Sequence, residues 1–368
     1  MPVPAQKPAT DAASIRIRRL VDSLEKQETE GLVIGHLPNI RYLFAFTGST
    51  ATALLSARGN FLFLDSRYTI QGGQETVACT VEEALPSADE ALARKIIALG
   101  LRSVAVEGAY LTLNRFYALR KHLPRRVAIR HRTGIVEGLR AVKTIDEIEE
   151  IRRTLRLTTQ AFDAIIPAVK PGIRERDVAA ELEYQLRKHG ARKPSFDTIV
   201  ASGARSALPH GLASDKVLQK NEFVVIDFGA YREGYASDVT RTLFLGKPSS
   251  EHRKVYRTVL DAVRRAEERT RPALKGRSVD RLAREHIEKA GFGVYFGHGA
   301  GHGIGLEVHE APFIHPRQEE RICTDMVFTI EPGIYLPDRG GVRIEDIVRV
   351  TPSGCEVLTS YTKELIVL

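Results

Sequence analysis

The spacing of apolar residues changes period several times within the first 140 residues of the chain. Ile17, Leu20, Val21 and Leu24 recur at helical spacing, and the short apolar run GLVIG that follows predicts a buried strand. Further along, the pattern predicts a β-hairpin from 51–57 and 61–66, a helix near 87–99, a strand at 102–107, a helix at 111–122 and a strand at 127–132. Helices that alternate with strands predict a layered α/β domain with a mixed sheet.

A long amphipathic segment near residue 140 marks the start of a second domain. It begins with Thr144 and Glu147, spaced as a capping box in which each side chain can bond to the other's backbone N–H at a helix start. The first residues of the chain contain prolines and small residues but no apolar run. We therefore expect a disordered tail at 1–13, an α/β domain at 14–140 and a second domain at 141–368.

The second domain contains an internal repeat. VVIDFGAY at 224–231 matches FTIEPGIY at 328–335 with an offset of 104 residues, and weaker matches lie upstream at nearly the same offset. Each half is predicted to contain two helices followed by a β-hairpin. The repeat predicts an α+β domain with pseudo-two-fold symmetry and a cleft where the hairpins face each other.

Four acidic residues take corresponding places in the two predicted hairpins. Asp227 and Glu331 follow the apolar first strands, while Asp238 and Glu345 lie on the returning strands. A single acid at a strand end is ordinarily solvated or paired, but four converging carboxylates beside apolar strands would repel one another strongly. Divalent cations would relieve that repulsion, so the pattern predicts a metal site.

The segment GHGAGHGIGLEVHE at 297–310 supplies candidate imidazoles, because it contains His298, His302 and His309. One imidazole beside four carboxylates would complete a five-ligand site for two metal ions. The glycines would allow close backbone approach or positive φ. A phosphate-binding loop fits poorly, because such a loop should precede a helix and no helix is predicted here.

Composition and charge exclude other classes of protein. The chain of 368 residues has 54 basic and 46 acidic residues, a net charge of +8, but the basic residues are dispersed. We therefore expect no nucleic-acid partner. No stretch approaches the roughly 18 apolar residues of a membrane span. Three cysteines without CxxC spacing argue against disulfides and thiolate zinc sites, so we expect a cytoplasmic protein with reduced thiols.

From about residue 14 onward, the sequence resembles the pita-bread metallopeptidases, specifically the Xaa-Pro peptidases aminopeptidase P and prolidase, which have a creatinase-like N-terminal domain. The resemblance rests on the 297–310 segment and on four further stretches: PSFDTIVASGARSALPHG, VVIDFGAYREGYASDVTRT, TIEPGIY and GVRIEDIV. It implies an α/β N-terminal domain and a pita-bread catalytic domain.

The resemblance also implies roles for individual residues. The metal ligands would be Asp227, Asp238, His302, Glu331 and Glu345, with Asp238 and Glu345 bridging two ions. Glu331 would also accept a proton from the attacking water, with His210 and His309 at the reacting carbonyl. His298, Tyr335 and Arg343 would line the proline side.

The function that follows is hydrolysis of the peptide bond before proline. We expect an Xaa-Pro aminopeptidase, with Xaa-Pro dipeptidase as the alternative. A donor set of four carboxylates and one imidazole favours manganese, with cobalt or zinc also able to bind. Relatives pair through the N-terminal domain, so a homodimer is expected, with NIRYLFAFTGS at 39–49 and Asp65, Arg67 and Tyr68 as contributors.

Other classes that share the fold are disfavoured. A non-catalytic binding module would have lost the ligands, and the metal-free amidinohydrolase creatinase would leave the acid cluster strained. Methionine aminopeptidase usually lacks an N-terminal α/β domain of this size.

Overall fold

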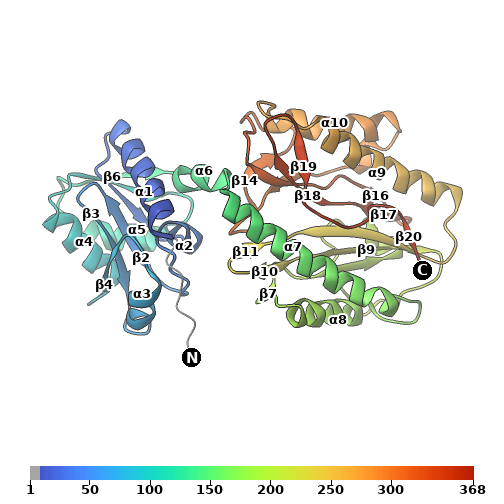
Figure 1. The fold of residues 1–368 in the computed structure, drawn as a ribbon, viewed down its shortest axis with the longest axis horizontal. Helices are drawn as coiled ribbons and strands as arrows, with labels where there is room; N and C mark the ends of the chain where they lie inside the picture. Colours follow the sequence, from blue (N-terminus) through green and yellow to red (C-terminus); the bar gives the residue numbers. More distant parts are fainter. Residues whose placement is uncertain (1–8) are drawn as a thin grey trace. The chain divides into compact units, whose positions relative to one another are not determined.

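The computed structural model describes residues 9–368, which divide into two compact units that meet in sequence between Leu139 and Arg140 (Figure 1). The first helix, α1, spans Ala9–Lys26, so residues 9–13, which we expected within a disordered tail, are helical. The remaining residues of that expected tail, 1–8, lie outside the described part of the chain. No helix within residues 9–368 is long and apolar enough to cross a membrane.

The N-terminal unit is built on a six-stranded mixed sheet of order β4-β3-β2-β1-β5-β6. Its strands are β1 Gly31–Ile34, β2 Thr52–Ser56, β3 Gly59–Leu64, β4 Thr80–Glu83, β5 Ser103–Glu107 and β6 Ala128–Arg132. Its other helices are α2 Leu37–Phe44, α3 Thr69–Glu75, α4 Ala88–Ala98 and α5 Leu113–His122, and α6 Ile135–Ala141 runs across the boundary. The predicted hairpin is confirmed, since β2 and β3 pair antiparallel.

Apolar residues on alternate positions of these strands form the core of this unit. Val33, Leu54 and Phe63 pack on one face with residues of α4 and α5. The stretch 39–49, expected to contribute to a dimer contact, is in large part core: Phe44 and Phe46 are fully buried. Its exposed part is confined to Ser49, with Thr50 following it.

The C-terminal unit places its strands between two pairs of helices (Figure 1). The helices are α7 Ile145–Ile165, α8 Glu175–Lys188, α9 Ser250–Arg269 and α10 Gly276–Lys289, with short 3-10 turns at Ile166–Ala168, Gly203–Ala207 and Gly293–Tyr295. The strands of the first half are β7 Lys193–Pro194, β8 Ile199–Ser202, β9 Glu222–Phe228, β10 Ala230–Arg232, β11 Tyr235–Ala236 and β12 Val239–Leu245. Those that follow are β13 Gly301–Gly303, β14 Glu310–Ile314, β15 Val327–Ile330, β16 Gly333–Leu336, β17 Gly340–Arg343, β18 Asp346–Val350, β19 Cys355–Val357 and β20 Ile366–Val367.

The internal repeat is visible in this unit. Helices α7 and α8 precede the antiparallel pair β9–β12, and α9 and α10 precede the antiparallel pair β15–β18. The capping box at the start of α7 is formed, with Thr144 N–H donating to Glu147 at 2.7 Å. One buried apolar cluster packs against α7 and α8 and another against α9 and α10, and each includes strand residues from both halves.

Both hairpins end in acidic residues. Asp227 lies in β9 opposite Thr240 of β12, and Glu331 comes directly after β15. Asp238 and Glu345 directly precede β12 and β18, whereas we had expected them within those returning strands. Because each pair of acids sits at the same end of its hairpin, the repeat can bring all four together.

Candidate active site

The predicted metal ligands line one cavity of about 370 Å³ in the C-terminal unit. All five of them are there, together with His210, His298, His309 and Arg343. The other lining residues, which the sequence did not single out, are Phe196, Asp197, Ile199, Pro209 and Leu212.

The ligand groups are close enough for a shared metal centre. Ligand atoms of Asp238, His302 and Glu345 all lie within 4.8 Å of one another. His302 Nε2 is 3.3 Å from Glu331 Oε1 and 3.6 Å from Asp238 Oδ2. The other ring nitrogen of His302, Nδ1, lies 3.1 Å from the backbone oxygen of Gly303. Donation to that oxygen would leave the Nε2 lone pair free for a metal ion.

Three buried carboxylate oxygens in this cluster have no hydrogen-bond partner among the described residues: Asp227 Oδ1, Asp238 Oδ1 and Glu345 Oε1. A buried carboxylate oxygen without a partner is costly, and hard oxygen donors are what divalent cations prefer. The residues therefore fit a metal centre.

Electrostatics support the same interpretation. Burial and the neighbouring Glu345 raise the pKa of Asp238 well above its usual range, and burial and Glu331 do the same for Glu345. Burial likewise raises the pKa of Asp227. Burial alone would raise the pKa of Glu331, but the hydrogen bond and charge of His302 lower it to about 2. Three of the four acids thus resist ionisation until a cation joins them.

Two threonines orient the ligand carboxylates. Thr240 donates its hydroxyl to Glu345 Oε2 at 2.7 Å, and Thr329 donates to Glu331 Oε1 at 3.1 Å. We did not predict either residue. Thr240 lies two positions after Asp238 and Thr329 two positions before Glu331, so period-2 spacing along an extended chain could have indicated both.

Arg343 lines the cavity and is also bonded to several groups of the protein itself. Its Nη2 binds Asp227 Oδ2 at 2.6 Å, its Nε bonds to Thr240, and its Nη1 donates to Pro209 O and the Tyr335 hydroxyl. Four of its five N–H groups are therefore used by the protein itself.

Tyr335 lies behind the cavity and is absent from the residues that line it. Its hydroxyl is 2.8 Å from His298 Nε2, while His298 Nδ1 is 2.7 Å from Gly299 O. Burial lowers the pKa of His298 and raises that of Tyr335. These directions favour a neutral imidazole that accepts from the tyrosine.

His210 and His309 also border the cavity. The rings of His309 and His302 lie 4.0 Å apart between centroids. Burial and the charge of His302 lower the pKa of His309. Among the described residues, neither His210 nor His309 has a hydrogen-bond partner for its ring nitrogens, so both rings are available to a bound molecule.

Glycines allow the chain to pass close to this site. A Cβ atom on Gly301 would lie 1.9 Å from Thr329 O, and one on Gly303 would lie 2.2 Å from Ala311 O. Close approach therefore explains these glycines. Positive φ, which we had also considered, does not occur at any of the five glycines of 297–305.

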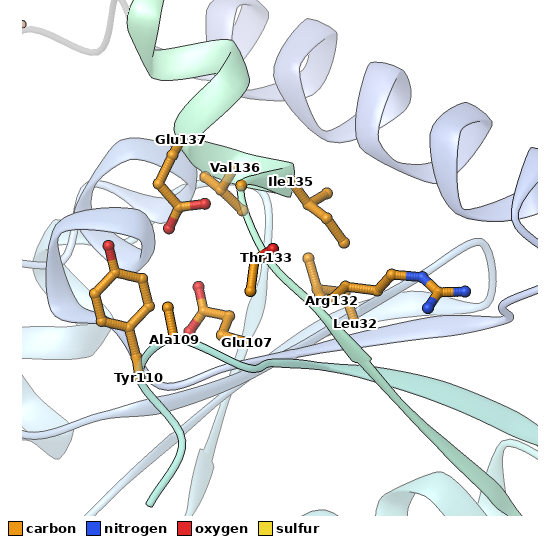
Figure 2. A pocket seen from close by; sticks show the side chains of 10 residues that line it. Leu32, Glu107, Ala109, Tyr110, Arg132, Thr133, Ile135, Val136 and Glu137 are labelled. Carbon is orange, nitrogen blue, oxygen red and sulfur yellow. The ribbon is translucent and has the colours of Figure 1, made fainter. Parts of the chain in front are cut away.

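A second cavity lies in the N-terminal unit, where Glu107, Tyr110 and Glu137 point toward it (Figure 2). Its free volume of about 10 Å³ admits about one water molecule. Glu107 accepts from the backbone N–H groups of Gly35 and His36 at the start of α2. This pocket is too small for a peptide, and its acid anchors a helix.

Comparison with known proteins identifies the family of the chain that carries this site. Residues 149–352 match the description "Metallopeptidase family M24", and residues 16–142 match "Creatinase/Prolidase N-terminal domain". The chain belongs to metallopeptidase family M24. The metallopeptidase is similar in structure to a Xaa-Pro dipeptidase from Bacillus anthracis, with a TM-score of 0.94 and 39% identity over 97% of this chain and 100% of that one.

Two further relatives of this metallopeptidase carry two different names. An X-Pro aminopeptidase from Thermotoga maritima has a TM-score of 0.88 and 38% identity over 96% of this chain and 99% of that chain. A Xaa-Pro dipeptidase of Pyrococcus horikoshii is 34% identical over 97% of this chain and 100% of its own length. The predicted fold class, an α/β N-terminal domain plus an α+β pita-bread catalytic domain, is confirmed.

Proposed function

We propose that this metallopeptidase hydrolyses the peptide bond that precedes proline, with Xaa-Pro dipeptides as its preferred substrates. The observation that carries the proposal is the cluster of four acids and His302, with three unpartnered carboxylate oxygens, in a cavity bordered by further histidines. Relatives at 34–39% identity over nearly the whole chain are named for Xaa-Pro cleavage.

In this proposal the ligands of two divalent ions are Asp227, Asp238, His302, Glu331 and Glu345. Bound ions of this kind polarise a scissile carbonyl and lower the pKa of water. Manganese fits the mainly carboxylate donor set, with cobalt or zinc as substitutes.

The remaining residues act on the peptide. Glu331 accepts a proton from the attacking water, while His309 and His210 offer free ring nitrogens to the reacting carbonyl. His298 borders the space for proline, and its Nε2 bonds to the Tyr335 hydroxyl, which also accepts from Arg343. Arg343 has one N–H group left for a substrate carboxylate.

Peptide length separates the two subtypes. We had favoured an aminopeptidase, but the comparisons support the dipeptidase alternative more strongly, because two of the three relatives above carry that name. The test compares Xaa-Pro, Xaa-Pro-Xaa and Xaa-Ala peptides that share the same first residue, with manganese present. We expect Xaa-Pro to be cleaved with the highest kcat/KM. Preference for the tripeptide would restore the aminopeptidase assignment, and failure on both proline peptides would refute the proposal.

We also propose a cytoplasmic homodimer. The three cysteines are free thiols, as expected in a reducing compartment. Side chains that could meet a second copy include Ile70, 77% exposed, and Arg67 beside Asp65 and Tyr68. Sedimentation equilibrium at micromolar concentration should give twice the chain mass. A monomer would refute the dimer.

A further inference from the structure

Three buried carboxylates outside the cavity hold three segments that carry histidines of the cavity. These are the His210 segment (203–213), the His298 segment (296–300) and the His309 segment (307–310). The carboxylates are Glu175, Asp280 and Glu310, and none of them lines the cavity. Each is paired with at least one basic side chain.

The His210 segment is held by Glu175, the first residue of α8, whose side chain is fully buried. Its Oε1 accepts from Ser202 N at 2.8 Å, and its Oε2 accepts from Ser214 Oγ at 2.6 Å. Arg205 donates Nε to Glu175 at 3.0 Å and Nη2 to Leu212 O at 2.6 Å. One carboxylate therefore ties together both ends of the segment.

The His298 segment is held by Asp280 of α10, with 1% of its side chain exposed. Arg284 donates Nε to Asp280 at 2.7 Å and Nη2 to the backbone oxygen of His298 at 2.6 Å. Asp280 also accepts from Ala300 N at 3.0 Å. Ala300 O in turn accepts from Glu331 N at 2.9 Å. The Asp280–Arg284 pair is therefore connected through Ala300 to the backbone of Glu331, a proposed metal ligand.

The His309 segment is held by the next residue, Glu310, with 4% of its side chain exposed. Lys143 donates to Glu310 Oε1 at 2.8 Å, and Arg140 contacts its other oxygen. Glu307 N also donates to Glu310 Oε2 at 3.3 Å. Both cations are almost fully buried.

We propose that Glu175, Asp280 and Glu310 are positioning residues, each acting on peptide hydrolysis through the histidine segment that it holds. Buried ion pairs are weak contributors to stability compared with apolar packing, so stability alone is a poor explanation for three of them beside three histidine segments. Displacing a reacting group by about 1 Å can cost on the order of 10²-fold in rate. The separate roles assigned to the three histidines rest on the proposed function.

Single substitutions of the three carboxylates should affect different kinetic constants, KM in one case and kcat in the other two. Asp280→Asn keeps the shape but weakens the hold on Arg284, and is expected to raise KM for Xaa-Pro on the order of 10-fold with a smaller change in kcat. Glu175→Gln and Glu310→Gln should instead lower kcat on the order of 10–10²-fold. Metal content should stay that of the wild type.

Asp325→Asn is the control in the same unit. Arg349 donates Nε and Nη2 to Asp325 Oδ1 at 2.9 and 2.6 Å, in an Arg–Asp pair that is more exposed than Arg284–Asp280 and does not touch a histidine segment. Its KM and kcat should equal those of the wild type. If Asp325→Asn shifts KM as far as Asp280→Asn does, loss of any ion pair suffices and the proposal is overturned.

A double-mutant cycle distinguishes positioning from general support. If Asp280 acts through His298, Asp280→Asn should add no further change in KM to His298→Ala. A full additional loss in the His298→Ala background would overturn the proposal for this pair.

Hydrogen exchange tests the same idea without activity. Asp280→Asn should speed amide exchange within 296–300 but not within 203–213, and Glu175→Gln should do the reverse. A wild type that fails on Xaa-Pro peptides would contradict the proposed function, and exchange would then decide the positioning proposal by itself. Unchanged or uniformly raised exchange would overturn it.

Discussion

The histidines of the cavity differ in what their ring nitrogens bind. His302 has Nδ1 next to Gly303 O and faces the acids through Nε2, whereas both nitrogens of His298 have protein partners. The ring nitrogens of His210 and His309 have no hydrogen-bond partner within residues 9–368. A ring without a partner in a cavity is free to bond to a substrate, and this difference supports separate roles for the histidines.

Replacing His309 or His210 by alanine should therefore lower turnover by roughly 10²–10³-fold, the usual loss when a group that stabilises the transition state is removed. Steady-state kinetics on Xaa-Pro, together with metal analysis, would check this. Both variants should retain metal. A His309→Ala protein that binds no metal would show that this imidazole is a ligand.

Sequence reasoning predicted which residues meet at the site but not how each is used. The repeat and the polar residues at the hairpin ends were sufficient to predict that Asp227 and Glu345 lie close together, because corresponding positions in a repeat converge. The engagement of Arg343 by Asp227, Tyr335 and Pro209 could not be predicted, since these partners lie 8 to 134 residues away in sequence. How many of a side chain's hydrogen-bonding groups find partners depends on the folded arrangement.

At the scale of elements, local periodicity predicted α1, α4, α5 and the β2–β3 hairpin of the N-terminal unit and the paired helices of the repeat, but it did not predict α2, α3, α6 or β4. The capping box of α7 formed as expected. Periodicity also did not predict the parallel pairing of β20 with β12, in which Ile366 lies opposite Leu243. Pairing between segments more than 100 residues apart leaves no local pattern. The helix at 9–13 was missed because small residues and a nearby proline resemble a tail.

Strand β13 gives a prediction at this scale, because two glycines of one segment differ in their surroundings. Gly301→Ala should lower the free energy of unfolding by about 1–3 kcal/mol or more, since the added methyl would overlap the backbone oxygen of Thr329. Gly297→Ala is the control, as a Cβ there meets nothing within 4 Å. Urea denaturation of both variants would measure the difference. Equal midpoints would contradict the explanation of these glycines by close approach.

At the scale of the whole molecule, the catalytic unit places a concentrated negative charge inside a chain whose net charge is +8. Burial raises the pKa of Asp227, Asp238 and Glu345 above their usual values of 3.8 and 4.5. Above those values the metal-free folded protein binds more protons than the unfolded chain, so its stability falls as pH rises. Glu331, with a pKa of about 2, changes its contribution only below its usual 4.5.

Metal ions at the proposed site would bind the deprotonated carboxylates and remove this penalty, so their stabilising effect should grow with pH. We expect the gap in Tm between manganese-loaded and metal-stripped protein to widen steadily from about pH 5.5 to about pH 8. Differential scanning calorimetry on both forms would measure it. Asp238→Asn is the informative variant: with one charge removed, its stripped form should be more stable than the stripped wild type at the higher pH and should gain little from manganese. A gap that stays constant with pH would mean that these acids are already ionised and paired without metal, which would contradict the electrostatic argument for the site.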